Sequence, residues 1–141
     1  MNNFTPKNYK YKKQNKGKLN DKINKPILLT NRTFSETLTL IAVENGRIKP
    51  NHLLCCHQIL NKKLKKIGQL NLKIFPHVPI TKKPLEIRMG KGKGAVDTHV
   101  VNLFTGTQIL QITGNNSDLI KKSLQQIKIK LPIKTKIVYA L

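Results

Sequence analysis

Alternating apolar and polar residues predict several short strands along this chain. In the stretch 34–43, Leu38, Leu40 and Ala42 alternate with Thr37, Thr39 and Ile41, which predicts a strand. The same alternation predicts strands at Leu70–Ile74, Leu85–Met89, Val96–Val101, Gln108–Thr113 and Ile133–Tyr139. Prolines 76, 79 and 84 stiffen the connection before the strand predicted at Leu85–Met89, and they exclude this connection from the middle of a sheet.

Two other stretches have the apolar spacing of amphipathic helices. The first spans Pro50–Ile67, and its predicted buried stripe contains Leu53, His57, Leu60, Leu64 and Ile67. His57 is expected at the edge of the core, and Gly68 is a natural helix stop.

The second helix is expected to begin at a Ser117 cap and to stop at Pro132, with Ile120, Leu124, Ile127 and Leu131 on its buried side. Ile129 falls on the polar side. This leaves two alternatives: the helix frays early, or that face meets a partner.

The order of these elements predicts an α+β fold in which two helices pack on a largely antiparallel sheet. Residues 1–30 read as a basic arm, with Phe4, Tyr9 and Tyr11 interleaved among lysines. Such an arm can neutralise phosphates and stack on bases, although a solvated tail is the simpler alternative. Residues 31–141 are expected to form a single domain.

A glycine-lysine loop follows the predicted strand at 85–89, with the sequence RMGKGKG from Arg88 to Gly94. Glycine permits close backbone approach and lysine supplies mobile positive charge. The spacing is not that of a nucleotide-binding P-loop, and no helix pattern follows it. The loop is therefore predicted to be the tip of a hairpin that can lie against a phosphate backbone, although alone it would equally fit a solvated turn.

The charge balance changes the picture. The chain of 141 residues has a formal net charge of +21, from 27 basic and 6 acidic residues. Such self-repulsion indicates a polyanionic partner, either nucleic acid or an anionic membrane surface. No apolar run reaches the roughly 18 residues of a spanning helix.

Metal binding and catalysis find little support. His52, Cys55, Cys56 and His57 are neighbours on one predicted helix, which cannot present four converging ligands on one side. The cysteines are predicted to be small apolar thiols in a reducing compartment. Carboxylates are few and scattered, and no serine has a nucleophile-elbow context. No cofactor and no metal site are expected.

Several of these stretches together resemble one family, the bacterial-type large ribosomal subunit protein sixteen. The most specific is PITKKPLEIRMGKGKG, from Pro79 to Gly94. The closing run KLPIKT, at 130–135, and the pair Gly46-Arg47 before the first helix are also similar to the family. The arm resembles the family's opening in Pro6-Lys7, Tyr11-Lys12-Lys13 and Lys16-Gly17-Lys18.

The resemblance covers residues 4–138 and implies a structural constituent of the large ribosomal subunit rather than an enzyme. The implied partners are large-subunit ribosomal RNA, the A-site tRNA with the P-site tRNA as a further candidate, and neighbouring large-subunit proteins. Neither a membrane nor a homo-oligomer is implied. The hairpin would reach toward the peptidyl-transferase region. The expected RNA-binding residues are Lys7, Lys10, Lys12, Lys13, Lys16, Lys18, Arg47, Lys82, Lys83, Arg88, Gly90, Lys91, Gly92, Lys93, Gly94 and Lys134.

The chain departs from the family's pattern at three places. Residues 19–31 lack the glycines expected there, His99 stands in place of a tryptophan, and Thr107 in place of a basic residue. These departures leave the local rRNA contacts at 19–31 and Thr107 open. A stand-alone nucleic-acid-binding module, such as a chaperone, is the alternative function, and an enzyme is the third.

The amino-acid composition bears on the location of the protein. Only three of the 27 basic residues are arginines, and asparagine and isoleucine are abundant. This skew, with a family motif that starts close to Met1 and leaves no room for an import presequence, predicts a mitochondrion that encodes the protein itself. A plastid and an A/T-rich bacterial cytoplasm are the alternatives. Arg88 is expected to hold a phosphate or a base through its planar fork, with chance retention as the alternative.

Overall fold

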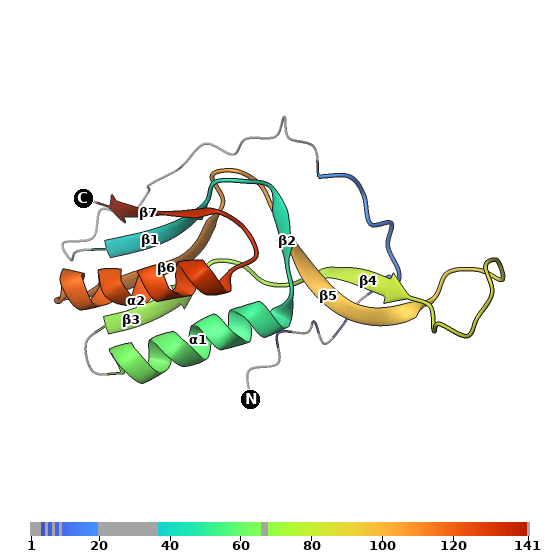
Figure 1. The fold of residues 1–141 in the computed structure, drawn as a ribbon, viewed down its shortest axis with the longest axis horizontal. Coiled ribbons are helices and arrows are strands. Elements are labelled where there is room, and N and C mark those ends of the chain that lie inside the picture. The colour runs from blue at the N-terminus through green and yellow to red at the C-terminus, as the bar shows by residue number, and fades with distance from the viewer. Residues whose placement is uncertain are drawn as a thin grey trace.

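The computed structural model describes Phe4, Pro6, Asn8 and residues 10–19, 37–65 and 68–140. Within these ranges the chain forms two helices and seven strands, so the predicted α+β class is confirmed (Figure 1). The predicted boundary between arm and domain, at residues 30 and 31, lies outside the described residues. In chain order the elements are β1 (Thr37–Ala42), β2 (Gly46–Ile48), α1 (Pro50–Leu64), β3 (Gly68–Leu72), β4 (Val78–Lys82), β5 (Ala95–Leu103), β6 (Gln108–Gly114), α2 (Ser117–Lys130) and β7 (Thr135–Ala140).

The strands form two antiparallel sheets, where the sequence predicted one. The first has the order β3-β6-β1-β7 and the second the order β2-β5-β4. Strand β1 is central in the first sheet, where Leu40 pairs with Leu110 on one side and Ile137 on the other. Strands β4 and β5 form a hairpin that extends away from the helices and carries the glycine-lysine loop at its end (Figure 1).

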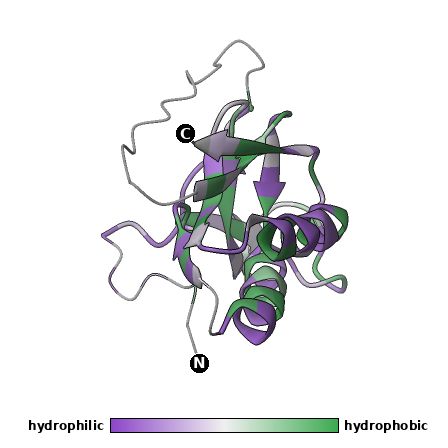
Figure 2. Cartoon of the chain, turned by 90° about the vertical axis from the view of Figure 1, so that its left-hand side faces the viewer, coloured by the Kyte–Doolittle hydropathy of each residue, from purple (hydrophilic) through white to green (hydrophobic). Residues whose placement is uncertain are grey.

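The core lies between the four-stranded sheet and the helices. Both helices lie beside each other on the same side of this sheet, with hydrophilic stretches on their outward surfaces (Figure 2). Leu40 and Ile112 from the sheet share one buried cluster with Leu60 of α1 and Leu124 of α2. Burying such apolar side chains is the main favourable term in folding.

Helix α1 differs from its prediction in its buried face and in its end. It ends at Leu64 instead of Ile67, and Ile67 itself lies outside the described residues. Cys56, rather than His57, joins Leu53, Leu60 and Leu64 in the core. Positions 53, 56, 60 and 64 follow the helical repeat as closely as the predicted set, and the small apolar thiol fits where a polar imidazole does not. His57 lies half-buried at the edge, as expected, where the Phe4 ring meets it at a centroid distance of 6.4 Å.

Helix α2 begins where predicted, but its cap is a different residue. The side-chain oxygen of Asn116 accepts a hydrogen bond from the backbone N–H of Leu119 at 3.2 Å, so Asn116, not Ser117, caps the helix. The helix continues through Lys130. The early-fraying alternative for Ile129 is therefore wrong, and its side chain is 82% exposed on an intact helix.

The strand predicted at Leu85–Met89 is absent, and this prediction was wrong. Leu85 and Met89 are both 99% exposed. The partner of β5 is instead β4, which contains Pro79 and pairs Ile80 with Thr98. Proline is tolerated because β4 lies at the edge of its sheet. With β5 already paired, the alternating residues after Pro84 have no strand to join and form part of the loop.

Candidate nucleic-acid interface

The glycine-lysine loop joins β4 to β5 and has a backbone that only certain residues adopt. Gly90, Lys91 and Gly92 have φ values of 97°, 53° and 84°, in the left-handed region that glycine enters without strain. The Nζ of Lys83 donates to the backbone oxygen of Gly90 and so crosses the loop. These features give the loop a defined turn, in which residues 84–93 are exposed to solvent.

Gly94 closes the base of the loop for a different reason. A Cβ added at this position would lie 2.6 Å from the backbone oxygen of Lys82 and 2.9 Å from its carbonyl carbon. The two chains of the hairpin therefore approach each other more closely here than any other residue would allow. Gly90 and Gly92 differ, because nothing lies within 4 Å of their added Cβ atoms.

The amino-terminal arm lies against the loop through a reciprocal pair of lysine contacts. Lys13 Nζ donates to the backbone oxygen of Lys93 at 3.0 Å. Lys93 Nζ in turn donates to the backbone oxygen of Gln14 at 2.6 Å and approaches Asn15 Oδ1 at 3.5 Å. Two basic segments almost 80 residues apart in sequence are thus side by side, as the path of residues 10–19 beside the hairpin shows (Figure 1).

Arg47 holds the next part of the arm. It lies half-buried on β2, and its Nε donates to Asn102 Oδ1 on the paired strand β5 at 3.1 Å. Its Nη2 donates to the backbone oxygens of Lys16 and Gly17 at 3.1 and 2.8 Å. Gly17 has a φ of 65°. This anchoring role was missed from the sequence, since the spacing of Arg47 and the arm says nothing of their contact.

We define the arm-hairpin surface as residues 10–19, Arg47 and the hairpin segment 82–94. It brings together most of the predicted RNA-binding residues. Lys134 lies elsewhere: its backbone N–H donates to Glu44 Oε1 at 2.8 Å and its oxygen accepts from the N–H of Val43. Lys7 lies outside the described residues.

The charge of the arm-hairpin surface is largely uncompensated. Within the described residues, Lys13, Lys83 and Lys93 donate hydrogen bonds to backbone and amide oxygens, not to carboxylates. The described residues include four acids, Glu44, Glu86, Asp97 and Asp118, of which Glu86 belongs to this surface and Asp97 follows it on β5. A dense set of cations without matching anions attracts polyanions.

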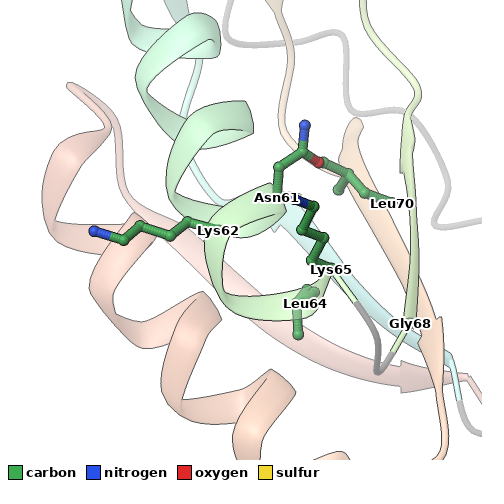
Figure 3. Close-up of a pocket in the computed structure, with 6 residues that line it drawn as sticks. All are labelled: Asn61, Lys62, Leu64, Lys65, Gly68 and Leu70. Carbon is green, nitrogen blue, oxygen red and sulfur yellow. The ribbon is translucent and has the colours of Figure 1, made fainter.

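No site for catalysis or for a metal emerges in the described ranges. No group of three histidine, cysteine or acidic residues there could hold a metal ion, and no described helix is long and apolar enough to cross a membrane. Burial raises the pKa of the Cys56 thiol to about 11, so this group is protonated at neutral pH. A hollow of about 420 Å³ between the end of α1 and β3 is lined by Asn61, Lys62, Leu64, Lys65, Gly68 and Leu70 (Figure 3). It contains no acid or nucleophile.

A small α+β core that carries a basic arm and a basic hairpin is the architecture of a structural ribosomal protein, whose extensions, rather than a cleft, face its partners. The family comparison agrees with this class. The sequence-family model of ribosomal protein L16p/L10e matches residues 6–138, and the chain therefore belongs to this family. It is a structural constituent of the large ribosomal subunit.

Proposed function

We propose that the arm-hairpin surface binds large-subunit ribosomal RNA and supports tRNA placement near the A site and the peptidyl-transferase region. The observation that carries this proposal is the pair of lysine hydrogen bonds that joins the arm to the hairpin. The contacts of Lys13 and Lys93 merge two basic segments into one continuous surface. A preformed surface loses less conformational entropy on binding than two separate flexible segments would.

The chemistry of this surface suits an RNA backbone. Lysines act as point charges for phosphates, and the open glycines at 90 and 92 let the loop follow a neighbouring surface closely. Folded RNA is recognised largely through shape and backbone, so a base-specific code is not required of the protein. Leu85 and Met89 are fully exposed at the loop, and contact with RNA would cover them.

The salt dependence of binding tests the phosphate contacts. Binding of the purified chain to large-subunit rRNA fragments should weaken linearly on a log–log scale, by on the order of a thousandfold between about 50 and 200 mM salt. A flat salt response would contradict the proposal. Co-sedimentation with large subunits through high-salt gradients separates a ribosomal constituent from a stand-alone RNA-binding module.

Arg88 tests the part that concerns tRNA placement. It lies exposed on the loop and makes no hydrogen bond to another described residue. Arg88→Lys keeps the charge, so subunits should incorporate the variant nearly as well as the parent protein but should synthesise peptide more slowly, since the planar fork is lost. If Arg88→Lys supports parental translation rates while Arg88→Ala does not, only charge matters there. Lys122→Gln on α2 controls for a general loss of charge.

We also propose a mitochondrial ribosome as the location, with organelle encoding. The support is the bias toward lysine, asparagine and isoleucine. Finding the gene in a bacterial chromosome would overturn this assignment.

A further inference from the structure

The outward face of the two helices contains a groove that the ribosomal RNA proposal does not use. We call it the helix groove: a hollow of about 400 Å³ lined by Ile59, Lys62, Lys63, Gln126, Ile129 and Lys130. Its lining residues come from α1 and α2. The two helices lie away from the extended β4–β5 hairpin (Figure 1). The helix groove and the arm-hairpin surface share no residue.

Apolar side chains form much of the helix groove. Ile129 is 82% exposed, although the opposite side of α2 already buries Ile120, Leu124 and Ile127 in the core. Ile59 of α1 is partly buried and packs against the core from below the groove. Ile129 therefore does not contribute to the buried core, and it lines the groove together with Ile59.

Positive charge borders the groove. Lys62 and Lys63 lie in the last turn of α1, and Lys130 lies at the end of α2. Lys63 Nζ donates to Gln126 Oε1, which links the two helices across the groove. The acid on the described helices, Asp118, lies in the first turn of α2 and does not line the groove. The described residues that line the groove therefore include three lysines and no carboxylate.

From this arrangement, we propose that the helix groove binds a segment of another protein in which an apolar side chain is flanked by carboxylates. The apolar side chain would cover Ile59 and Ile129, and the carboxylates would pair with Lys62 and Lys130. RNA fits the groove less well. Phosphates gain nothing from an isoleucine floor, and the lining offers no planar aromatic or guanidinium group on which a base could stack.

The test uses the full chain and an acidic amphipathic peptide of about 15 residues, near the length at which an isolated helix becomes stable. The peptide carries leucines along one face and glutamates beside them, and it is fluorescently labelled for anisotropy. A scrambled peptide of the same composition has the same charge without the apolar face. Measurements at physiological salt screen general attraction to the polycation.

Two pairs of substitutions decide the outcome. Ile129→Ala should weaken binding of the amphipathic peptide about five- to tenfold through lost apolar burial. Leu119→Ala removes another exposed apolar side chain of α2, 43% exposed and outside the groove, and should leave binding unchanged. Lys130→Gln should weaken binding about two- to threefold, whereas Lys122→Gln should not. Thermal melts verify that each variant keeps its fold.

Three results would each overturn the proposal. The scrambled peptide could bind as tightly as the amphipathic one, Ile129→Ala could behave like Leu119→Ala, or a short single-stranded RNA of matched charge could displace the peptide and show the same Ile129 dependence. The rRNA affinity of Ile129→Ala should equal that of the parent protein, because the groove is separate from the arm-hairpin surface. A negative result for peptide binding at the helix groove would therefore leave the RNA-binding proposal for the arm-hairpin surface untouched, and the reverse also holds.

Discussion

Replacing Arg47 with alanine should release the arm from the body of the protein while leaving the core intact. The substitution removes three hydrogen bonds, one to Asn102 and two to the backbone oxygens of Lys16 and Gly17. Only the last two hold the arm. The bond to Asn102 holds the Arg47 guanidinium against β5, in the position from which it reaches the arm.

The size of the effect follows from the exposure of these bonds. A hydrogen bond contributes about 1 kcal/mol to stability on average, and more when one group is charged. The two bonds to the arm are solvent-exposed, so water competes for both partners. We expect a loss of about 1–2 kcal/mol in arm docking, or about a five- to thirtyfold fall in the ratio of docked to undocked arm. The melting temperature should change little, because the buried cluster is untouched.

Limited trypsin digestion measures the docked fraction, since cleavage after Lys16 and Lys18 requires a released backbone. Arg47→Ala should be cut faster there by roughly the factor expected for undocking. Arg47→Lys should lie between the parent and Arg47→Ala, because one ammonium cannot reproduce the fork. Arg88→Ala removes the same charge from a residue without a described hydrogen-bond partner and should be cut at the parental rate. Equal rates for Arg47→Ala and Arg88→Ala would refute the anchoring role.

Three further predictions concern the loop, the buried thiol and the second helix. Gly94→Ala forces a Cβ against the Lys82 backbone and should cost about 2–3 kcal/mol in urea unfolding, whereas Gly92→Ala, at a φ of 84° in open space, should cost about 1 kcal/mol; equal costs would contradict the close-approach argument. Iodoacetamide at neutral pH should modify Cys55 and spare buried Cys56. Because burial raises the Cys56 pKa from 9.0 to about 11, the unfolded chain loses this proton first, and stability should decline from pH 9 toward 11 in the parent but less so in Cys56→Ala. Asn116→Ala should cost about 1 kcal/mol and Asn116→Asp much less, measured by urea unfolding; an equal loss would show that the cap bond contributes nothing.

The sequence was a good guide wherever burial and periodicity act together. The stripes of both helices identified most of their core positions, because one buried face imposes its period on the residues that fill it. In β5 the alternation found the strand but not its core, since the adjacent residues Val100 and Val101 are both buried. At Leu85–Met89 the same alternation misled. Alternation says that a strand is compatible with the residues, whereas pairing requires a neighbour with unused hydrogen-bonding groups, and β4 had taken that place.

The contacts of the site could not be read from the sequence for a related reason. One hydrogen bond joins Lys13 to Lys93, 80 residues away. Another joins Arg47 to Lys16, 31 residues away. Their acceptors are backbone oxygens, which every residue possesses, so no pattern of side chains announces them. Charge density predicted a cationic surface that binds a polyanion, which stays a prediction, whereas the way its segments meet depends on the path of the chain.

The contacts of Arg47 explain why one of the three arginines stands in a chain that otherwise uses lysine. In a chain that otherwise uses lysine, Arg47 stands where a rigid fork is needed, since its Nε and Nη2 serve three acceptors on two segments at once. Lysine could supply the charge there but not this geometry. Arg32 lies outside the described residues. Arg88 has no comparable set of acceptors within the described chain, although it lies beside lysines that already supply positive charge. The comparison of Arg88→Lys with Arg88→Ala therefore asks whether the fork, which serves three acceptors at position 47, also matters at position 88.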